Sequence, residues 1–246
     1  MVQFYPVGTT AATEYAAQFL SRKGLDIVDH PTPEVTHLLL DVPSFGPGGL
    51  LRSGGRIDKI LETIPQYITV VGGRLEHPSL EGYKTWDMLQ NEAYLTRNAA
   101  ITADCALQVA APLLTTAFSQ TPTLVIGWGR IGKCLARMLH GLGCPVTVAA
   151  RKEKDRAMLH ALGYSAADPG NLNGAYRLIF NTAPEPVLTK QILSRFPNCV
   201  KIDLASRKGL EGEDVVWARG LPGIYAPESS GRLIADTILQ LLKEET

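Results

Sequence analysis

Short apolar runs alternate along the first hundred residues with stretches in which apolar residues recur at helical spacing. The runs predict strands at residues 3–7, 25–28, 37–42 and 67–71, and the helical spacing predicts helices at residues 11–22 and 57–64. The run at residues 37–42 is almost continuously apolar, which suits a strand covered on both faces. Strands that alternate with helices predict a parallel, doubly wound sheet.

Residues 123–151 contain the clearest pattern in the chain. An apolar run at residues 123–126 is followed by a turn that reads Gly-Trp-Gly-Arg-Ile-Gly, which has the G-x-G-x-x-G spacing. Helical spacing follows at residues 131–142, and a second strand is predicted at residues 146–150. Strand, glycine turn, helix and strand within about thirty residues predict a Rossmann dinucleotide-binding fold.

Each glycine of the turn has its own physical role. Gly127 allows a sharp turn, Gly129 places no side chain between the backbone and a pyrophosphate, and Gly132 lets the helix pack close to the strand. The N–H groups at the positive end of the helix dipole would then face the phosphates. The predicted coenzyme contacts of this turn are Gly127, Trp128, Gly129, Arg130, Ile131 and Gly132. The alternative is a glycine-rich turn that binds no ligand.

The end of the second strand predicts which dinucleotide binds. An NAD-selective site places Asp or Glu there to accept a hydrogen bond from the ribose 2′-hydroxyl. Here Arg151 and Lys152 follow the strand, and we expect no carboxylate at this position to repel a phosphate. Because a guanidinium pairs bidentately with phosphate, the sequence favours NADP over NAD. A solvated basic loop is the alternative.

The rest of the pattern predicts the domain organisation. We expect a helix at residues 80–90, an extended link at 93–98, a long helix at 105–118, helices at 155–162, 189–195 and 229–243 (the last capped by Ser229 or Ser230), strands at 178–181, 200–204 and 215–218, and a loop at 220–223. These elements predict an N-terminal α/β domain on the substrate side (residues 1–100), a connecting helix (101–121) and a Rossmann NADP-binding domain (122–246). The last helix of that domain is able to pack back on the first domain.

Composition limits the function classes. Lys and Arg total 24 and Asp and Glu total 24, so the net charge of zero gives no electrostatic reason to expect nucleic acid or an anionic membrane. No apolar run is long enough to span a bilayer, and the N-terminus lacks the pattern of a signal peptide. None of the four cysteines forms a C-x-x-C pair or lies at metal-ligand spacing from a histidine, so we expect no metal site and a reducing, cytoplasmic location.

Four sequence blocks follow one another in an order and spacing typical of one family. They are residues 127–151, the NTAP segment at 181–184, the DLASR segment at 203–207 and the GLPGIYAP segment at 220–227. Over roughly residues 93–242 the chain thereby resembles the A subunit of bacterial dipicolinate synthase. Many dehydrogenases share the glycine motif, but DLASR followed by GLPGIYAP is much more selective.

The resemblance implies two domains, one of them a Rossmann half, and a second, flavoprotein subunit as the partner. It implies synthesis of dipicolinate for bacterial spores, from a cyclic hydroxy-tetrahydropyridine dicarboxylate. The chain departs from the family at residues 102–105, where Thr-Ala-Asp-Cys replaces Thr-x-Glu-Gly. Its N-terminal region also lacks a clean opening strand with a glycine turn.

Ligands of open α/β sheets bind beyond the carboxyl ends of the strands, so we expect nicotinamide and substrate in a cleft between the two domains. Asn181, Thr182, Ala183 and Pro184 are further candidate coenzyme contacts. The candidate substrate contacts are Ser44, Gly73 and Arg207, since a dicarboxylate needs a cation or N–H groups.

Four residues are candidates for the chemistry, namely Asp203, Ser206, Asn98 and Thr102. Asp203 is either an acid/base or a buried strand-end carboxylate that orients Ser206 or the neighbouring backbone. Asn98 and Thr102, at the expected start of the connecting helix, would present amide, hydroxyl and helix N–H groups to a substrate carboxylate.

The sequence therefore leads to the hypothesis of an NADP-dependent oxidoreductase that acts on a small cyclic dicarboxylate, works with a flavoprotein partner and forms a homo-oligomer. A small 2-hydroxy or imino acid dehydrogenase is the alternative enzyme. A nucleotide-binding subunit without catalytic activity is the alternative from another class, because no histidine has the pairing typical of hydroxyacid dehydrogenases.

Overall fold

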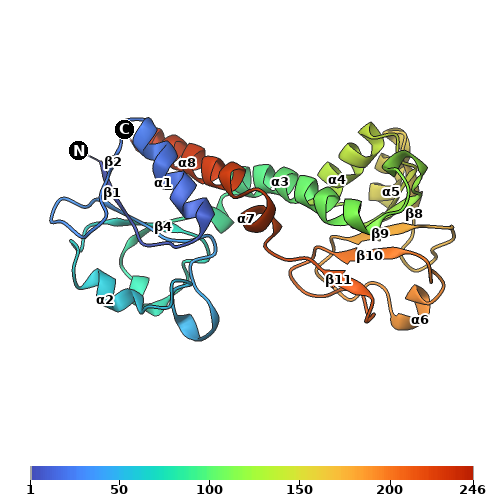
Figure 1. Ribbon diagram of the computed structural model, residues 1–246, viewed down its shortest axis with the longest axis horizontal. Helices are drawn as coiled ribbons and strands as arrows, with labels where there is room; N and C mark the ends of the chain where they lie inside the picture. The colour runs from blue at the N-terminus through green and yellow to red at the C-terminus, as the bar shows by residue number, and fades with distance from the viewer. Residues whose placement is uncertain (1, 246) are drawn as a thin grey trace. The chain divides into compact units, whose positions relative to one another are not determined.

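The computed structural model describes residues 2–245, and the chain divides into two compact units (Figure 1). The first unit comprises the chain up to Asn98 together with the chain from Pro222, and the second comprises Ala99–Leu221. Each unit contains one sheet in which all strand pairs are parallel. The predicted class, two doubly wound parallel-sheet domains, is confirmed.

The sheet of the first unit has the strand order β2-β1-β3-β4-β5, which is the flavodoxin-like order of doubly wound folds. Its strands are β1 (Gln3–Pro6), β2 (Asp26–Ile27), β3 (His37–Leu39), β4 (Thr69–Gly72) and β5 (Lys84–Asp87). Helices α1 (Ala11–Arg22) and α8 (Pro227–Glu244) lie on one side of this sheet and α2 (Ile57–Leu61) on the other (Figure 1).

Helices α1 and α8 pack along each other within the first unit. Their backbones approach closely at Gly231, where an added Cβ would lie 2.5 Å from both the Ala12 carbonyl oxygen and the Tyr15 Cβ. The predicted serine caps of α8 are wrong, because α8 begins at Pro227, whose fixed φ suits the first helical position. The Ser230 hydroxyl instead donates to the Ala226 carbonyl oxygen.

The strand predicted at residues 3–7 is present as β1, and a glycine turn follows it, so the departure from the family noted for this region is wrong. After β1, the Asp41 carboxylate accepts hydrogen bonds from the N–H groups of Thr9 and Thr10 at 3.1 and 3.0 Å, and from the hydroxyls of Thr10 and Thr13, both at 2.6 Å. Burial alone would raise the pKa of Asp41, but these hydrogen bonds hold it below its usual value. An added Cβ at Gly8 would lie 2.6 Å from Asp41, so glycine is needed at the turn. Asp41 thus occupies the α1 N-terminus at the β1/β3 switch point of this sheet.

The sheet of the second unit has the order β11-β10-β9-β6-β7-β8, which is the 3-2-1-4-5-6 order of the Rossmann fold. Its strands are β6 (Thr123–Ile126), β7 (Val146–Ala149), β8 (Ser165–Ala167), β9 (Leu178–Asn181), β10 (Val200–Asp203) and β11 (Val215–Trp217). Helices α4 (Arg130–Gly141) and α5 (Glu153–Ala161) lie on one side, and α6 (Lys190–Leu193) lies on the other (Figure 1).

Burial explains why strand β6 and helix α4 of this unit were predicted correctly. All four residues of β6 are buried, as a strand with neighbours on both edges and helices on both faces requires. The buried residues of α4 are Gly132, Leu135, Ala136 and Leu139, which form one face at helical spacing.

Helix α3 (Glu92–Ala110) differs from the expectation, and the boundary between the two units falls inside it. It begins at Glu92 rather than at residue 101, because the Asn91 side chain accepts a hydrogen bond from the Tyr94 N–H at 2.9 Å and caps the helix. It ends before Pro112, which has no N–H to continue the helix. The predicted extended link at residues 93–98 is therefore wrong.

Three shorter elements also differ. Residues 80–90 do not form the predicted helix, because Lys84–Asp87 pairs with β4 as the edge strand β5. Helix α7 (Leu221–Tyr225) lies where a loop was expected, and strand β8 was not predicted. All three are short, and short elements depend most on their neighbours in space.

Candidate coenzyme site

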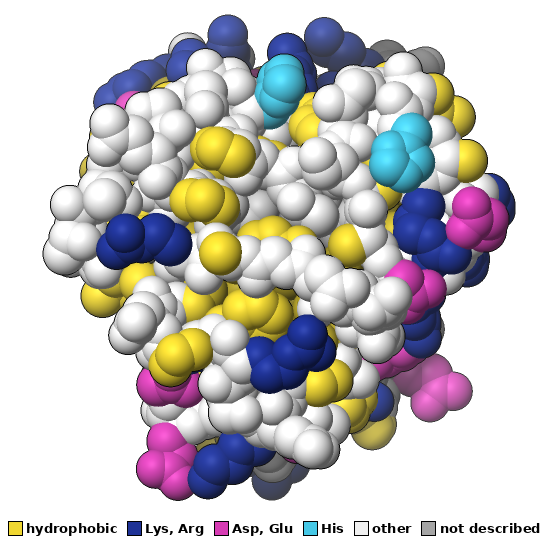
Figure 2. All heavy atoms as spheres, turned by 90° about the vertical axis from the view of Figure 1, so that its right-hand side faces the viewer, with side chains coloured by type: hydrophobic (Ala, Val, Ile, Leu, Met, Phe, Trp, Pro, Cys, Tyr) yellow, Lys and Arg dark blue, Asp and Glu magenta, His cyan; other side chains and the backbone are white. Residues whose placement is uncertain are grey.

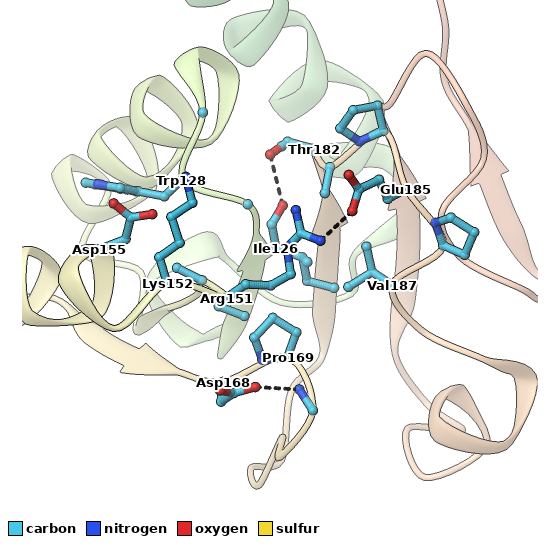
Figure 3. Close-up of a pocket in the computed structure, with 18 of the residues that line it drawn as sticks. Ile126, Trp128, Arg151, Lys152, Asp155, Asp168, Pro169, Thr182, Glu185 and Val187 are labelled. Carbon is cyan, nitrogen blue, oxygen red and sulfur yellow. Dashed lines mark hydrogen bonds and ion pairs between the residues drawn. The ribbon is translucent and has the colours of Figure 1, made fainter.

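A pocket of about 550 Å³ lies at the carboxyl ends of β6, β7 and β9 in the second unit (Figure 3). Strand order reverses between β6 and β9, and ligands of open α/β sheets bind at such a switch point. Eight of the predicted coenzyme contacts line it: Gly127, Trp128, Gly129, Arg151, Lys152, Thr182, Ala183 and Pro184. Arg130, Ile131 and Gly132 form the first turn of α4, next to the lining.

The three glycines have the geometry that their spacing predicts. Gly127 has a φ of +102°, and an added Cβ would lie 2.5 Å from the Thr182 hydroxyl oxygen. An added Cβ on Gly132 would lie 2.1 Å from the Gly127 carbonyl oxygen, so α4 packs directly against the turn. Gly129 differs from both, because, apart from its own atoms and those of its two chain neighbours, no atom of the described chain lies within 4 Å of its Cβ position. The α4 N-terminus is therefore open at the point where a pyrophosphate binds in this fold.

One side of the pocket is apolar. Ile126, Ala149, Ala150, Pro169, Val187 and Ile192 contribute to its lining. An apolar wall beside a few polar groups suits a planar base such as adenine. The residues present therefore fit a dinucleotide, with the phosphates at α4 and the base against this wall.

A carboxylate lies beside Arg151, contrary to the expectation from the sequence. The Arg151 Nη1 is 2.5 Å from the Glu185 Oε2, which comes from the loop after β9 (Figure 3). Asp155 and Asp168 also line the pocket. The local sequence around Arg151 contained no signal for Glu185, because the parallel pairing of β9 with β6 brings its loop to this edge.

Asn181 and Asp203 form a buried network below the pocket. The Asn181 amide nitrogen donates to the Asp203 Oδ1 and to the Ala183 carbonyl oxygen, both at 3.0 Å. Asp203 accepts three further hydrogen bonds, at 3.0, 2.7 and 2.9 Å, from the N–H groups of Ala205, Gly209 and Leu210. Both side chains are fully buried. Asn181 and Asp203 therefore position the surrounding loops, in agreement with the backbone-orienting alternative, and neither lines the pocket.

The remaining candidates for chemistry and the substrate candidate Arg207 do not line the pocket. Ser206 and Arg207 are exposed in the loop after β10. Asn98 and Thr102 lie in the middle of α3, where backbone N–H groups bond within the helix, so neither is at a helix start. The physical reason is the cap at Asn91, which moves the start of α3 upstream.

The two substrate candidates of the first unit are structural in this conformation. The buried Ser44 hydroxyl donates to the Asp41 carbonyl oxygen at 2.8 Å and accepts from the Gly73 N–H at 3.1 Å. An added Cβ on Gly73 would lie 2.7 Å from Val42. Ser44 and Gly73 thus join the loops after β3 and β4.

The part of the lining that follows β8 was not predicted from the sequence. Asp168, Pro169 and Gly170 line the pocket, and the Asp168 Oδ1 accepts from the Gly170 N–H at 2.8 Å. An Asp-Pro-Gly turn is itself a usable signal. It was missed because Ser165–Ala167 contains only small residues.

The described residues also bear on surface charge, membrane-spanning helices, metal-binding clusters and the state of the cysteines. On the face shown in Figure 2, Lys and Arg side chains are interspersed with Asp and Glu, and hydrophobic side chains gather near the centre. Within residues 2–245, no helix is long and apolar enough to cross a membrane, and no three metal-binding side chains cluster. The cysteines are free thiols, and burial raises the pKa of Cys105, Cys144 and Cys199, the last to about 12.

Comparison with known proteins gives the type of domain that contains the pocket. Residues 96–196 match the NAD binding domain of the D-isomer specific 2-hydroxyacid dehydrogenases. The dipicolinate synthase A subunit of Bacillus subtilis (strain 168) is 33% identical over 132 residues, which are 49% of this chain and 44% of that protein. Over these residues the chain is similar to the dipicolinate synthase A subunit. The sequence match spans less than half of that relative's length.

Solved structures show the same fold over 99% of the chain. The A chain of dipicolinate synthase from Bacillus subtilis has a TM-score of 0.81 at 21% identity and covers 99% of this chain and 96% of its own. Transhydrogenase from Sinorhizobium meliloti has a TM-score of 0.74 at 13% identity, with coverage of 99% and 94%. The second unit is thus an NAD(P)-binding domain of the dehydrogenase type.

Proposed function

We propose that the protein is an NADP-dependent oxidoreductase that converts a cyclic hydroxy-tetrahydropyridine dicarboxylate to dipicolinate. Dipicolinate is the product named in the similar protein, the dipicolinate synthase A subunit. The observation that carries the nucleotide part is the open α4 N-terminus at Gly129, next to a pocket that has one apolar side and Arg151 in its lining. When bound, the nicotinamide coenzyme supplies the hydride chemistry.

The residues of this chain would hold the coenzyme in three places. The first-turn N–H groups of α4 and its helix dipole favour the pyrophosphate. The wall that includes Ile126 and Val187 excludes water from the base. Arg151 would pair with the 2′-phosphate, because its planar guanidinium matches phosphate oxygens in pairs.

The substrate, the partner and the location are proposals that rest on the relationship. We propose that a flavoprotein partner completes the reaction and that the pathway serves dipicolinic acid synthesis in sporulating cells. The free cysteines support a reducing cytoplasm. Arg207 stays a candidate for a substrate carboxylate, since it is an exposed cation at the carboxyl end of β10.

Coenzyme binding is tested by titrating the protein with NADPH and NADH and following coenzyme fluorescence. Arg151→Ala is expected to weaken NADPH binding about tenfold, because one charge-assisted phosphate contact is lost, and to change NADH binding by less than about twofold. Unchanged NADPH affinity in Arg151→Ala would refute the 2′-phosphate contact.

Turnover separates the two alternative functions. A 2-hydroxy acid dehydrogenase oxidises a simple hydroxy acid without a partner, and the match of residues 96–196 gives that alternative its support. A nucleotide-binding subunit without activity binds NADPH but turns over neither substrate, alone or with a flavoprotein. The proposed enzyme forms dipicolinate from the cyclic dicarboxylate.

A further inference from the structure

The guanidinium at the mouth of the pocket already has an anionic partner. The Arg151 Nη1 and the Glu185 Oε2 are 2.5 Å apart and join the end of β7 to the loop after β9 (Figure 3). Solvent reaches 73% of the Arg151 side chain and 55% of the Glu185 side chain. An anion that is to use the Nη1 donor of Arg151 therefore competes with Glu185 for it.

The loop that carries Glu185 is held by its surroundings. Pro184 and Pro186 flank Glu185 and restrict the backbone φ on either side. The Val187 N–H donates to the Gly209 carbonyl oxygen at 2.8 Å, and an added Cβ on Gly209 would lie 2.4 Å from the Glu185 carbonyl oxygen. A fixed backbone keeps the carboxylate within reach of Arg151, so the pairing follows from the fold of the loop.

We propose that Glu185 sets the coenzyme selectivity of the pocket by competing with the 2′-phosphate of NADP for Arg151. This inference rests on the proposed function, in which Arg151 receives that phosphate. NADP must displace the carboxylate, whereas NAD carries no 2′-phosphate and leaves the pair intact. Glu185 therefore weakens NADP binding and spares NAD, even though it lies on a different strand loop from the acidic residue of NAD-selective sites.

The strength of the ion pair between Arg151 and Glu185 decides whether the 2′-phosphate can replace Glu185. An exposed ion pair in water is weak and contributes about fivefold or less to an equilibrium. A phosphate carries more charge than a carboxylate and forms stronger charge-assisted hydrogen bonds with a guanidinium. The phosphate can thus replace Glu185, but it does so at a reduced affinity.

The test is a set of titrations with NADPH and NADH, read by coenzyme fluorescence, on the full chain. The variants are Glu185→Gln, Arg151→Ala and the double variant, each checked for folding by circular dichroism. Glu185→Gln is expected to tighten NADPH binding about fivefold and to change NADH binding by less than about twofold. In the Arg151→Ala background the same substitution is expected to change NADPH binding by less than about twofold.

Glu213→Gln is the matched control. It removes the same charge from the same unit, at a side chain that is 99% exposed and 3.9 Å from Lys190. Equal NADPH affinity in the Glu185→Gln protein and the Glu213→Gln protein would overturn the inference, and so would a gain that persists without Arg151. If Arg151→Ala weakens NADPH binding in that case, the proposed function stands and only the role of Glu185 fails. If Arg151→Ala has no effect, the phosphate contact and this inference fail together.

Discussion

His37 is a buried histidine whose ring is packed among aromatic side chains in the first unit. Its ring centroid lies 4.6 Å from that of Phe4 and 5.1 Å from that of Trp86, and among the described residues its Nε2 has no hydrogen-bond partner. Burial lowers the pKa of His37 to about 4, while Glu245 opposes and Lys84 adds to the effect. His37 is therefore neutral in the folded protein at neutral pH.

Protonation of His37 is expected to link stability to pH. In the unfolded chain the pKa is about 6.5, so the unfolded state takes up the proton first as the pH falls, and stability decreases between about pH 6.5 and 4. The loss is at most about 3 kcal/mol, from a pKa difference of about 2.5 units. Urea unfolding across this range should show a shallower pH dependence for His37→Leu than for the wild type. An unchanged slope would contradict the account, and His30→Leu, at an exposed site, is the control.

At the scale of single residues, the sequence predicted the roles of residues in a local turn better than the roles that depend on strand pairing. Gly127, Gly129 and Gly132 could be assigned because their spacing reflects a local turn. Asn181 could not, because its buried contact with Asp203 depends on the pairing of β9 with β10.

At the scale of elements, the glycine turn and α4 make the phosphate end of the site. Gly129 has an extended backbone with φ of −82°, which any residue can adopt, and open space at its Cβ position. Gly132 has no such space. A methyl group added at residue 129 is therefore expected to affect coenzyme binding and not folding, whereas one added at residue 132 would disturb the fold.

Gly129→Ala is expected to fold normally and to bind NADPH at least about tenfold more weakly, because its methyl group occupies the approach of the pyrophosphate. Fluorescence titration measures the binding, and thermal unfolding confirms the fold. Gly141→Ala, an open position near the other end of the same helix, should leave NADPH affinity unchanged. Normal NADPH affinity in folded Gly129→Ala would show that the phosphates do not lie at α4.

The elements that could be predicted are those whose signal is local. The helical spacing of α4 and the buried run of β6 are both complete within a short segment. Strand β5 was mistaken for a helix because only Trp86 of its four residues is buried, so its apolar pattern is weak. The start of α3 was misplaced because the Asn91 cap was overlooked, which in turn misplaced Asn98 and Thr102.

At the scale of the whole molecule, the two units use the chain differently. The second unit is continuous in sequence, whereas the first needs α8 from the far end of the chain. Every residue that lines the coenzyme pocket belongs to the second unit. Damage to the α1–α8 contact should therefore affect the first unit alone.

Gly231→Leu is expected to destabilise the first unit by about 2 kcal/mol or more, because the side chain meets the α1 backbone. Urea unfolding should show this loss, while NADPH titration in the absence of urea should give wild-type affinity. Ser229→Leu, at an exposed position of the same helix, is the control. A Gly231→Leu protein as stable as the control would contradict the packing, and a folded variant with lost NADPH affinity would contradict the independence of the pocket.

The most direct test of the account is a crystal structure of the protein with NADPH. We predict density for the pyrophosphate at the first turn of α4 beside Gly129, with the 2′-phosphate on Arg151 and Glu185 turned away. A well-ordered crystal with no coenzyme in this pocket, together with no NADPH binding in solution, would contradict the central claim.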